Sequence, residues 1–417
     1  MSSSRRLAAA FDLGTTTIAA ALVDPATGER LAVTGALNPQ RRWGADVLSR
    51  LTAAADPETL RAMQGALALE MERMADDLLA QAGAADVELS LVAVAGNPSM
   101  EHIALALPVA SLAYPPFRPL FTAGKDVNTL DLGWRREIAA YLLPLPGGFV
   151  GGDLLAFLFG LEGTPLRGTL YIDMGTNAEI ALFDGERYLS TSAAAGPAFE
   201  GGNLRCGMAA LPGAVSGVRI QGDRVILSTI GGAAPLGLCG SGVLETVTSL
   251  IDCGIIESTG RLRPAAEVDS NLANRLQEVN GTLAFVLHRD ASGLVYLDQE
   301  DIRALQLAKG ALRGGMEILL AKANISLDDV EQVVLTGSFG AVLSPEVLKK
   351  VGIFNEKMVK ISGFIREGAL AGVERMLVLE NGRDRMEQLA QQVRVIPLSG
   401  TPLFEKLFLA NIDFPNP

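Results

Sequence analysis

Two stretches of the chain carry the same polar residues in the same order, and those residues suit the binding of a phosphate and a metal ion. The first reads FDLGTTTIAAALVDPATGERL from residue 11, and the second reads IDMGTNAEIALFDGERYL from residue 172. In each stretch an apolar run reaches an aspartate, Asp12 or Asp173, and a glycine-threonine pair follows at once. Mg²⁺ usually binds one or two carboxylates and keeps several waters. The repeat therefore predicts two hairpins that clamp one nucleotide.

The turns that follow the two aspartates supply further donors for phosphate oxygens. Glycine permits backbone conformations that aim amides at an anion, and hydroxyl side chains add donors. The residues concerned are Gly14, Thr15, Thr16 and Thr17 in the first turn, and Gly175, Thr176 and Asn177 in the second. Aspartate and threonine are also common in ordinary turns, which is the alternative for a single hairpin. The duplication favours the phosphate site, in which Asp12 and Asp173 hold Mg²⁺ partly through water.

A third aspartate opens an apolar segment between the two hairpins. Gly151, Gly152 and Asp153 begin the run GGDLLAFLFGL, which predicts a helix leading into the second hairpin. Asp153 suits the N-cap of that helix. It equally suits a carboxylate that orients or deprotonates a water attacking a γ-phosphate. Both interpretations stay open.

Glycine-rich turns elsewhere give further candidates for a ligand cleft. Gly337 follows the predicted strand QVVLT, where a backbone could pass close to a base or ribose. Gly201 and Gly202 are two more candidates, although loop geometry alone can require glycine there. The chain holds no GxxxxGK[ST] sequence, which excludes a Walker-type phosphate loop.

The repeat extends beyond the hairpins to the elements around them. Apolar periodicity predicts helices over 57–82 and 299–323, each followed by a strand, at 89–97 and 332–340. Both halves therefore read β-β-β, insertion, α, β, α, which predicts a duplicated α/β domain with ligands at the carboxyl ends of the strands. We place the first lobe at 1–165 and the second at 166–417, and the prediction allows a helix near 366–380 to pack back on the first lobe.

Composition narrows the function classes. The chain has 417 residues, a net charge of −12 and 49% hydrophobic residues, with no unbroken apolar run of membrane-spanning length. This predicts a soluble, cytoplasmic protein without nucleic-acid or membrane partners. The three cysteines (Cys206, Cys239 and Cys253) form no CxxC pair, and two histidines are too few for a histidine-rich metal site.

The motifs resemble those of the actin, Hsp70 and sugar-kinase superfamily. The matching segments are 11–17, 151–160, 171–180, 333–340 and 366–377. Within that superfamily, the strings DMGTNAEI, AAAGPAFEGGNLRCGM, LCGSGV and LTGSFG look like the ATPase domain of the reductive activators of corrinoid proteins. The resemblance implies a duplicated, ribonuclease-H-like, two-lobed ATPase with a nucleotide cleft between its lobes.

The resemblance also implies a function and a set of roles. In that family, ATP hydrolysis drives the reduction of cob(II)alamin to cob(I)alamin on a corrinoid protein or methyltransferase. ATP and Mg²⁺ are the implied cofactors. Asp12, Asp153 and Asp173 are the implied catalytic residues, and Gly337, Ser338 and Phe339 would lie near the adenosine.

One departure from the family pattern concerns electron supply. Such activators normally carry an N-terminal [2Fe-2S] domain with closely spaced cysteines, which this sequence lacks. We therefore expect no iron-sulfur cluster in this chain, and a redox domain that is separate or missing. A homodimer is left open.

Three other functions compete with this one. The first is a small-molecule kinase of the same fold, with Asp153 as base. The second is an activator of a 2-hydroxyacyl-CoA dehydratase, in which Cys206 and Cys239 would hold a shared cluster. The third is a module that binds nucleotide without turnover.

Overall fold

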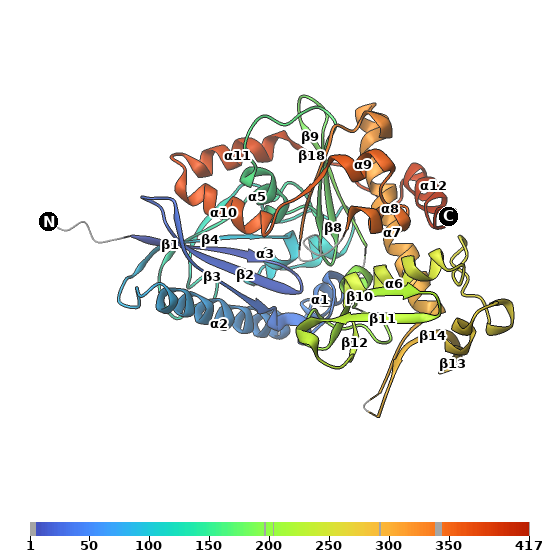
Figure 1. The fold of residues 1–417 in the computed structure, drawn as a ribbon. Coiled ribbons are helices and arrows are strands. Elements are labelled where there is room, and N and C mark those ends of the chain that lie inside the picture. The colour runs from blue at the N-terminus through green and yellow to red at the C-terminus, as the bar shows by residue number, and fades with distance from the viewer. Residues whose placement is uncertain (1–5, 196, 203, 292, 338–343, 417) are drawn as a thin grey trace. The chain divides into compact units, whose positions relative to one another are not determined.

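The chain forms two compact units, each built around its own sheet. The computed structural model describes residues 6–195, 197–202, 204–291, 293–337 and 344–416 (Figure 1). Unit 1 comprises Met1–Arg167, Phe183–Thr191 and Arg366–Ile396, and unit 2 comprises Gly168–Leu182, Ser192–Ile365 and Pro397–Pro417. The helix predicted near 366–380 is α10 (Gly368–Val378), and it belongs to unit 1.

The sheet of unit 1 has six strands in the order β3-β2-β1-β4-β6-β5. Its strands are β1 (Leu7–Leu13), β2 (Thr17–Asp24), β3 (Glu29–Leu37), β4 (Leu89–Gly96), β5 (Lys125–Asn128) and β6 (Ala139–Leu142). Strand β1 pairs antiparallel with β2 and parallel with β4, and β4 pairs parallel with β6.

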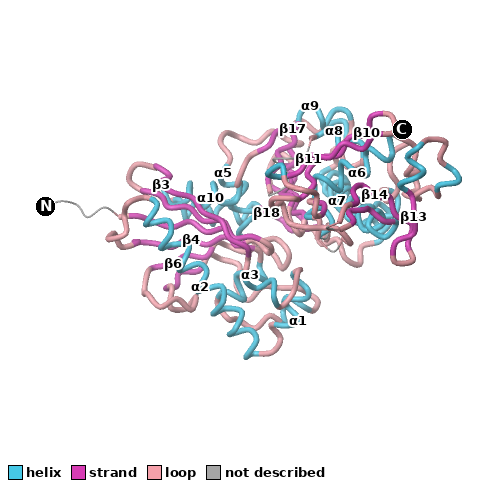
Figure 2. Tube along the Cα trace, turned by 60° about the horizontal axis from the view of Figure 1, so that its bottom comes forward, coloured by secondary structure: helices cyan, strands magenta, loops and turns pink. Residues whose placement is uncertain are grey.

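Alternation along β1 divides the core of unit 1 into two layers. Leu7, Ala9, Phe11 and Leu13 pack with α2 (Pro57–Gln81), and Ala10 packs on the opposite face with α5 (Gly152–Gly160) and α10. Side chains in a strand alternate between faces, so large residues on one side and alanines on the other let α5 and α10 approach the sheet closely. Figure 2 shows α2 and α10 on the sheet of unit 1.

Glycine makes the contact between α5 and α10 close. A Cβ on Gly372 would lie 1.7 Å from the carbonyl oxygen of Ala156, and one on Gly160 would lie 3.0 Å from the amide nitrogen of Gly372. A larger residue at either position would therefore push α10 off α5. This contact explains the small residues of the segment 366–377 and fixes α5, which carries Asp153, against the sheet.

The sheet of unit 2 repeats the pairing of unit 1. Strand β7 (Thr169–Met174) pairs antiparallel with β8 (Ala178–Phe183) and parallel with β16 (Gln332–Thr336), which pairs parallel with β17 (Ser362–Phe364). The order β8-β7-β16-β17 thus matches β2-β1-β4-β6 in both neighbours and directions. The duplicated sequence has folded twice into the same strand arrangement.

The remaining elements surround these sheets. Unit 2 adds two three-stranded sheets, made of β10 (Ala214–Gln221), β11 (Arg224–Thr229) and β12 (Gly237–Leu238), and of β13 (Leu276–Val279), β14 (Thr282–Arg289) and β15 (Leu294–Asp298). Its helices are α6 (Gly240–Asp252), α7 (Gln299–Ala323), α8 (Pro345–Lys350), α9 (Glu356–Ile361) and α12 (Pro402–Ala410). Unit 1 also holds α1 (Val47–Ala53), α3 (Pro98–Ala104), α4 (Ala110–Ala113) and α11 (Gly382–Gln392). Strands β9 (Tyr188–Ala193) and β18 (Val393–Val395) pair in parallel and complete the six-stranded order β17-β16-β7-β8-β9-β18.

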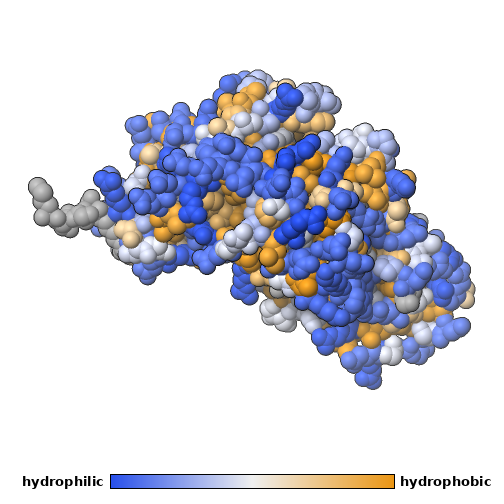
Figure 3. Space-filling model, turned by 90° about the horizontal axis from the view of Figure 1, so that it is seen from above, coloured by the Kyte–Doolittle hydropathy of each residue, from blue (hydrophilic) through white to orange (hydrophobic). Residues whose placement is uncertain are grey.

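No described helix has the length and apolar character that crossing a membrane requires. Hydrophilic side chains cover much of the face drawn in Figure 3, with smaller apolar areas between them.

Candidate functional site

Turn 1 (residues 12–17) joins β1 to β2, and two buried asparagines hold it. Asn38 donates from Nδ2 to the carbonyl oxygen of Gly14 at 2.9 Å, and its backbone N–H donates to the carbonyl oxygen of Thr16 at 2.9 Å. Asn97 donates from Nδ2 to Oγ1 of Thr15 at 3.0 Å. A Cβ on Gly14 would lie 2.5 Å from the carbonyl oxygen of Thr17, so the turn has room only for glycine there.

The register of the sheet puts Asp12 on the face that α5 covers. Asp12 pairs with Ala95 of β4, and Ala95 belongs to the cluster around α5 and α10. A Cβ on Gly152, the first residue of α5, would lie 3.6 Å from the Cα of Ala95. The predicted Asp12 and Asp153 are thus brought to the same face of one sheet, at the carboxyl end of β1.

Asp153 lies in the first turn of α5, and the N-cap is Gly151. The N-cap interpretation of Asp153 is therefore wrong by two positions. Its Oδ1 accepts a hydrogen bond from the backbone N–H of Leu154 at 2.8 Å, and the side chain is partly exposed. Loss of hydration raises the pKa of Asp153 to about 6, against the opposite effect of the backbone amides at the helix start.

Sequence reasoning missed a second carboxyl beside Asp153. Glu101 of α3 is fully buried, and its Oε1 accepts a hydrogen bond from the backbone N–H of Gly96 at 3.1 Å. Burial raises its pKa well above the ordinary value, and the charge of Asp153 raises it further. The signal was a lone glutamate in the short apolar helix PSMEHIA. Asn38 and Asn97 were missed too, because asparagine after a strand usually marks only a turn.

Turn 2 (residues 173–177) joins β7 to β8 and is closed by its own backbone. The N–H of Gly175 donates to the carbonyl oxygen of Asn177 at 3.1 Å, and Thr176 is buried. A Cβ on Gly175 would meet that same oxygen at 3.4 Å, an ordinary contact. Asp173 pairs with Thr336 of β16, just as Asp12 pairs with Ala95 of β4.

Gly337 brings a second backbone against Asp173. It has φ +101°, and a Cβ there would lie 2.7 Å from Oδ1 of Asp173 and 2.4 Å from the carbonyl oxygen of Met174. Ser338 and Phe339, predicted near the adenosine, lie outside the described residues. Gly201 has φ +68° and packs on β12, with 2.7 Å from a Cβ there to the carbonyl oxygen of Leu238. Gly202 follows it and is partly exposed.

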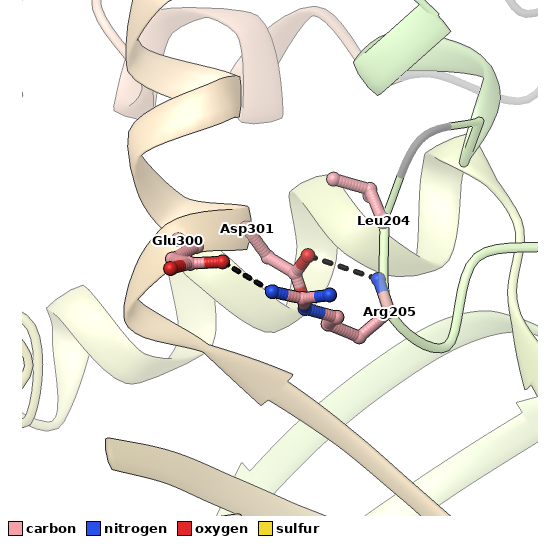
Figure 4. A pocket seen from close by; sticks show the side chains of 4 residues that line it. All are labelled: Leu204, Arg205, Glu300 and Asp301. Atoms are coloured by element: carbon pink, nitrogen blue, oxygen red, sulfur yellow. Dashed lines mark hydrogen bonds and ion pairs between the residues drawn. The ribbon is translucent and has the colours of Figure 1, made fainter. Parts of the chain in front are cut away.

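Unit 2 also contains a pocket of about 450 Å³ at the start of α7, lined by Leu204, Arg205, Glu300 and Asp301 (Figure 4). The Arg205 guanidinium forms ion pairs with Glu300 and Asp298, and the Arg205 backbone N–H donates to Oδ1 of Asp301 at 3.0 Å. Burial raises the pKa of Asp301 to about 6. The pocket begins two residues after Gly202, so it adjoins one of the predicted ligand loops.

The donors at the two turns are of the type that fits Mg²⁺. Asp12 and Asp173 are partly exposed carboxylates at strand ends, the donor type that a largely hydrated Mg²⁺ uses. Within the described ranges, no group of three or more His, Cys, Asp or Glu side chains could hold a metal ion. Cys239 is buried, with Sγ 3.3 Å from the carbonyl oxygen of Val215, and Cys253 is exposed.

Comparison with known proteins identifies the family. A family model described as the C-terminal domain of RACo, the ASKHA domain, matches residues 167–417, and one described as the RACo middle region matches residues 7–162. The chain belongs to the RACo family. ASKHA denotes the fold of the actin, Hsp70 and sugar-kinase superfamily, so the fold expected from the sequence is confirmed. The resemblance to the reductive activators of corrinoid proteins is confirmed as well.

Two curated proteins and one solved structure resemble this RACo-family chain. It is 29% identical to the corrinoid activation enzyme RamQ of Eubacterium limosum, over 97% of the chain and 70% of that protein. It is 26% identical to a Co(II) methylated amine-specific corrinoid protein reductase of Methanosarcina barkeri, over 64% of the chain and 49% of that protein. A structure titled reductive activator for corrinoid, iron-sulfur protein superposes with a TM-score of 0.87 at 26% identity, covering all of the chain and 67% of that structure.

Proposed function

We propose that this chain is the ATP-hydrolysing part of a reductive activator of corrinoid proteins. ATP hydrolysis to ADP and phosphate would drive the transfer of one electron to cob(II)alamin, giving cob(I)alamin on a corrinoid protein or methyltransferase. The electron would come from an iron-sulfur donor. The observation that carries the proposal is the duplicated Asp-x-Gly-Thr turn, placed twice on the same strand arrangement in a chain of the RACo family.

The residues of the two turns would divide the work on the nucleotide. Asp12 and Asp173 would hold Mg²⁺ partly through water, and the ion would neutralise charge on the phosphates. The phosphate-binding residues would be Gly14, Thr15, Thr16, Thr17, Gly175, Thr176 and Asn177, whose backbone and side-chain donors lie at strand ends. Gly337, Ser338 and Phe339 would lie near the adenosine, and Gly201 and Gly202 would belong to a further loop around the nucleotide.

Asp153 would orient the attacking water and accept its proton. A pKa of about 6 keeps its carboxylate ionised at neutral pH yet still basic enough to take a proton. Its position in the first turn of α5, on the sheet face of Asp12, supports this assignment.

Coupling to the partner would follow from ATP-dependent closure of the protein, which would change the surface offered to the corrinoid protein. Phosphate release would then let the partner leave. We propose a soluble, cytoplasmic protein.

The test is phosphate release from Mg-ATP with and without a corrinoid methyltransferase system from the same organism. Slow hydrolysis that rises at least about tenfold with the corrinoid protein would support the activator. Transfer of phosphate to a metabolite hydroxyl, without a corrinoid effect, would instead make the chain a kinase. A serum albumin control at equal concentration excludes non-specific stimulation.

A further inference from the structure

Glu101 is buried without the partners that an ionised carboxylate needs. It is 0% exposed, and the hydrogen bond from Gly96 to Oε1 is the one that its carboxyl group makes among the described residues. Glu72, in the same unit, is also buried, but it forms ion pairs with Arg135 at 2.9 Å and Arg136 at 3.4 Å. A buried carboxylate loses its hydration, and without a neighbouring cation nothing compensates for this loss. The group avoids the cost by keeping its proton and staying neutral.

The packing around Glu101 links it to the start of α5. A Cβ on Gly152 would lie 2.8 Å from Oε1 of Glu101 and 2.8 Å from Cβ of Leu143, so glycine lets α5 begin directly against this carboxyl group. A Cβ on Gly151 would lie 2.9 Å from Oδ1 of Asp153. Gly152 thus lets α5 begin against the buried glutamate, and Asp153 is the next residue of that helix.

The charged groups around α3 single out Asp153 as the partner. Strand β4 contains no ionisable side chain, and Asp153 is the one charged residue of α5. His102, the neighbour of Glu101 on α3, is occupied by the carbonyl oxygen of Pro98 and the N–H of Leu120. Of the groups described on α1, α2, α3 and α5, Asp153 is the one whose charge acts on Glu101.

We propose that Glu101 is a positioning residue for Asp153: it stays protonated at neutral pH, and its Oε2–H holds the Asp153 carboxylate, directly or through one water. Oε1 is taken by the Gly96 N–H, which leaves the proton on Oε2, the oxygen that has no described partner. One proton is then shared by two acidic groups, with Asp153 as the ionised member. The catalytic consequence rests on the proposed function of Asp153, but the protonation of Glu101 does not.

Infrared spectroscopy at pH 7 tests the protonation without any need for activity. The wild-type spectrum minus that of Glu101→Gln should show the C=O band of a protonated carboxyl group. The matched control is Glu72→Gln, whose difference spectrum should show only the bands of an ionised carboxylate. A carboxylate band at Glu101 would overturn the proposal.

The titration of Asp153 tests the positioning role. Glu101→Gln keeps the shape, the acceptor oxygen and a donor, so the pKa of Asp153 should stay within about 0.3 of the wild-type value. Glu101→Met removes the donor, so the pKa of Asp153 should rise, because a hydrogen bond to the charged form is lost. If Gln instead lowers the pKa of Asp153, Glu101 is a charged neighbour and the proposal is wrong.

ATP hydrolysis by the same variants separates positioning from simple packing. For folded protein, with thermal unfolding as the check, Glu101→Met should lower the rate about tenfold and Glu101→Gln less than about threefold. Equal losses in both variants would mean that Glu101 only packs. Absence of hydrolysis in the wild type would count against the proposed function, while the infrared and titration results would still decide the state of Glu101.

Discussion

Turn 1 and turn 2 share one sequence pattern and one strand arrangement, yet the protein supports them differently. Side chains from distant segments, Asn38 and Asn97, hold turn 1. Turn 2 is closed by a hydrogen bond within itself, and the backbone of Gly337 lies against its aspartate. The duplication therefore kept the carboxylate, the glycine and the strand pairing, and among the described residues the contacts around Gly14 and Gly175 differ. We expect ATP hydrolysis to require the features that both copies retain.

The two aspartates give the largest expected effect and test whether the copies are equivalent. Asp12→Asn and Asp173→Asn should each lower ATP hydrolysis about a thousandfold, because each removes a charged ligand worth several kcal/mol to the bound metal. Phosphate release at saturating Mg-ATP measures the loss. The control is Asp77→Asn, a partly exposed aspartate on α2 that pairs with Arg73.

The relative losses of activity at Asp12 and Asp173 show whether the two turns are equivalent. Equal losses would mean that both turns bind the metal. A large loss at one turn and wild-type rates at the other would assign the metal to one copy only. Wild-type rates in both variants would remove the site assignment altogether.

Asp153 belongs to the surroundings of turn 1 and should give the next largest effect. Asp153→Asn should lower hydrolysis about a hundredfold, the usual contribution of a general base. A base must be ionised, so with a pKa of about 6 the wild-type rate should fall about tenfold per pH unit below pH 6. An aspartate with an ordinary pKa of about 3.9 would keep the rate constant down to about pH 4.

A profile of the hydrolysis rate from pH 4.5 to 8 measures this loss of rate at acidic pH. The matched control is Glu58→Gln, an acid in the first turn of α2, as Asp153 is in the first turn of α5. If the residual rate of Asp153→Asn falls at acidic pH as the wild-type rate does, another group is responsible for that fall.

Repetition and periodicity predicted the framework of the protein. The helix expected at 299–323 is α7 with the same bounds, and the one expected at 57–82 is α2. Both predictions rest on long amphipathic patterns, which are the most secure local signal. The strands at 89–97 and 332–340 are β4 and β16, although β16 ends at Thr336.

The sequence did not predict the short elements of the insertions. Strands β10 to β15 and helix α11 went unassigned, because short runs and polar helices carry little periodicity of their own. The same limit applies to the site. Asp12 and Asp173 stand in a repeated motif, whereas Glu101 has no motif and gains its chemistry only from burial beside α5. Burial of one polar group follows from tertiary packing, which a single sequence does not display.

Substitution of Gly14 and of Gly175, the glycines of the two turns, should affect ATP binding to different extents. Gly14→Ala would force a Cβ to 2.5 Å from the carbonyl oxygen of Thr17, whereas Gly175→Ala meets its nearest oxygen at 3.4 Å. We expect Gly14→Ala to weaken ATP binding about tenfold or more and Gly175→Ala less than about threefold. Calorimetric titration with a non-hydrolysable ATP analogue measures both. Equal losses would show that the phosphates, rather than the local packing, need glycine in both copies.

The smallest effect concerns the stability of turn 1. Asn38 is fully buried, donates to Gly14 and accepts a hydrogen bond from the N–H of Gln40 at 2.9 Å. Asn38→Ala would leave that buried N–H without its acceptor, which costs about 1–3 kcal/mol. Amide hydrogen exchange over residues 11–18 should therefore speed up by about tenfold, while exchange over residues 172–179 stays unchanged. Asn271→Ala, at an exposed side chain, is the control. Equal acceleration in both turns would mean that Asn38 stabilises the whole protein rather than turn 1.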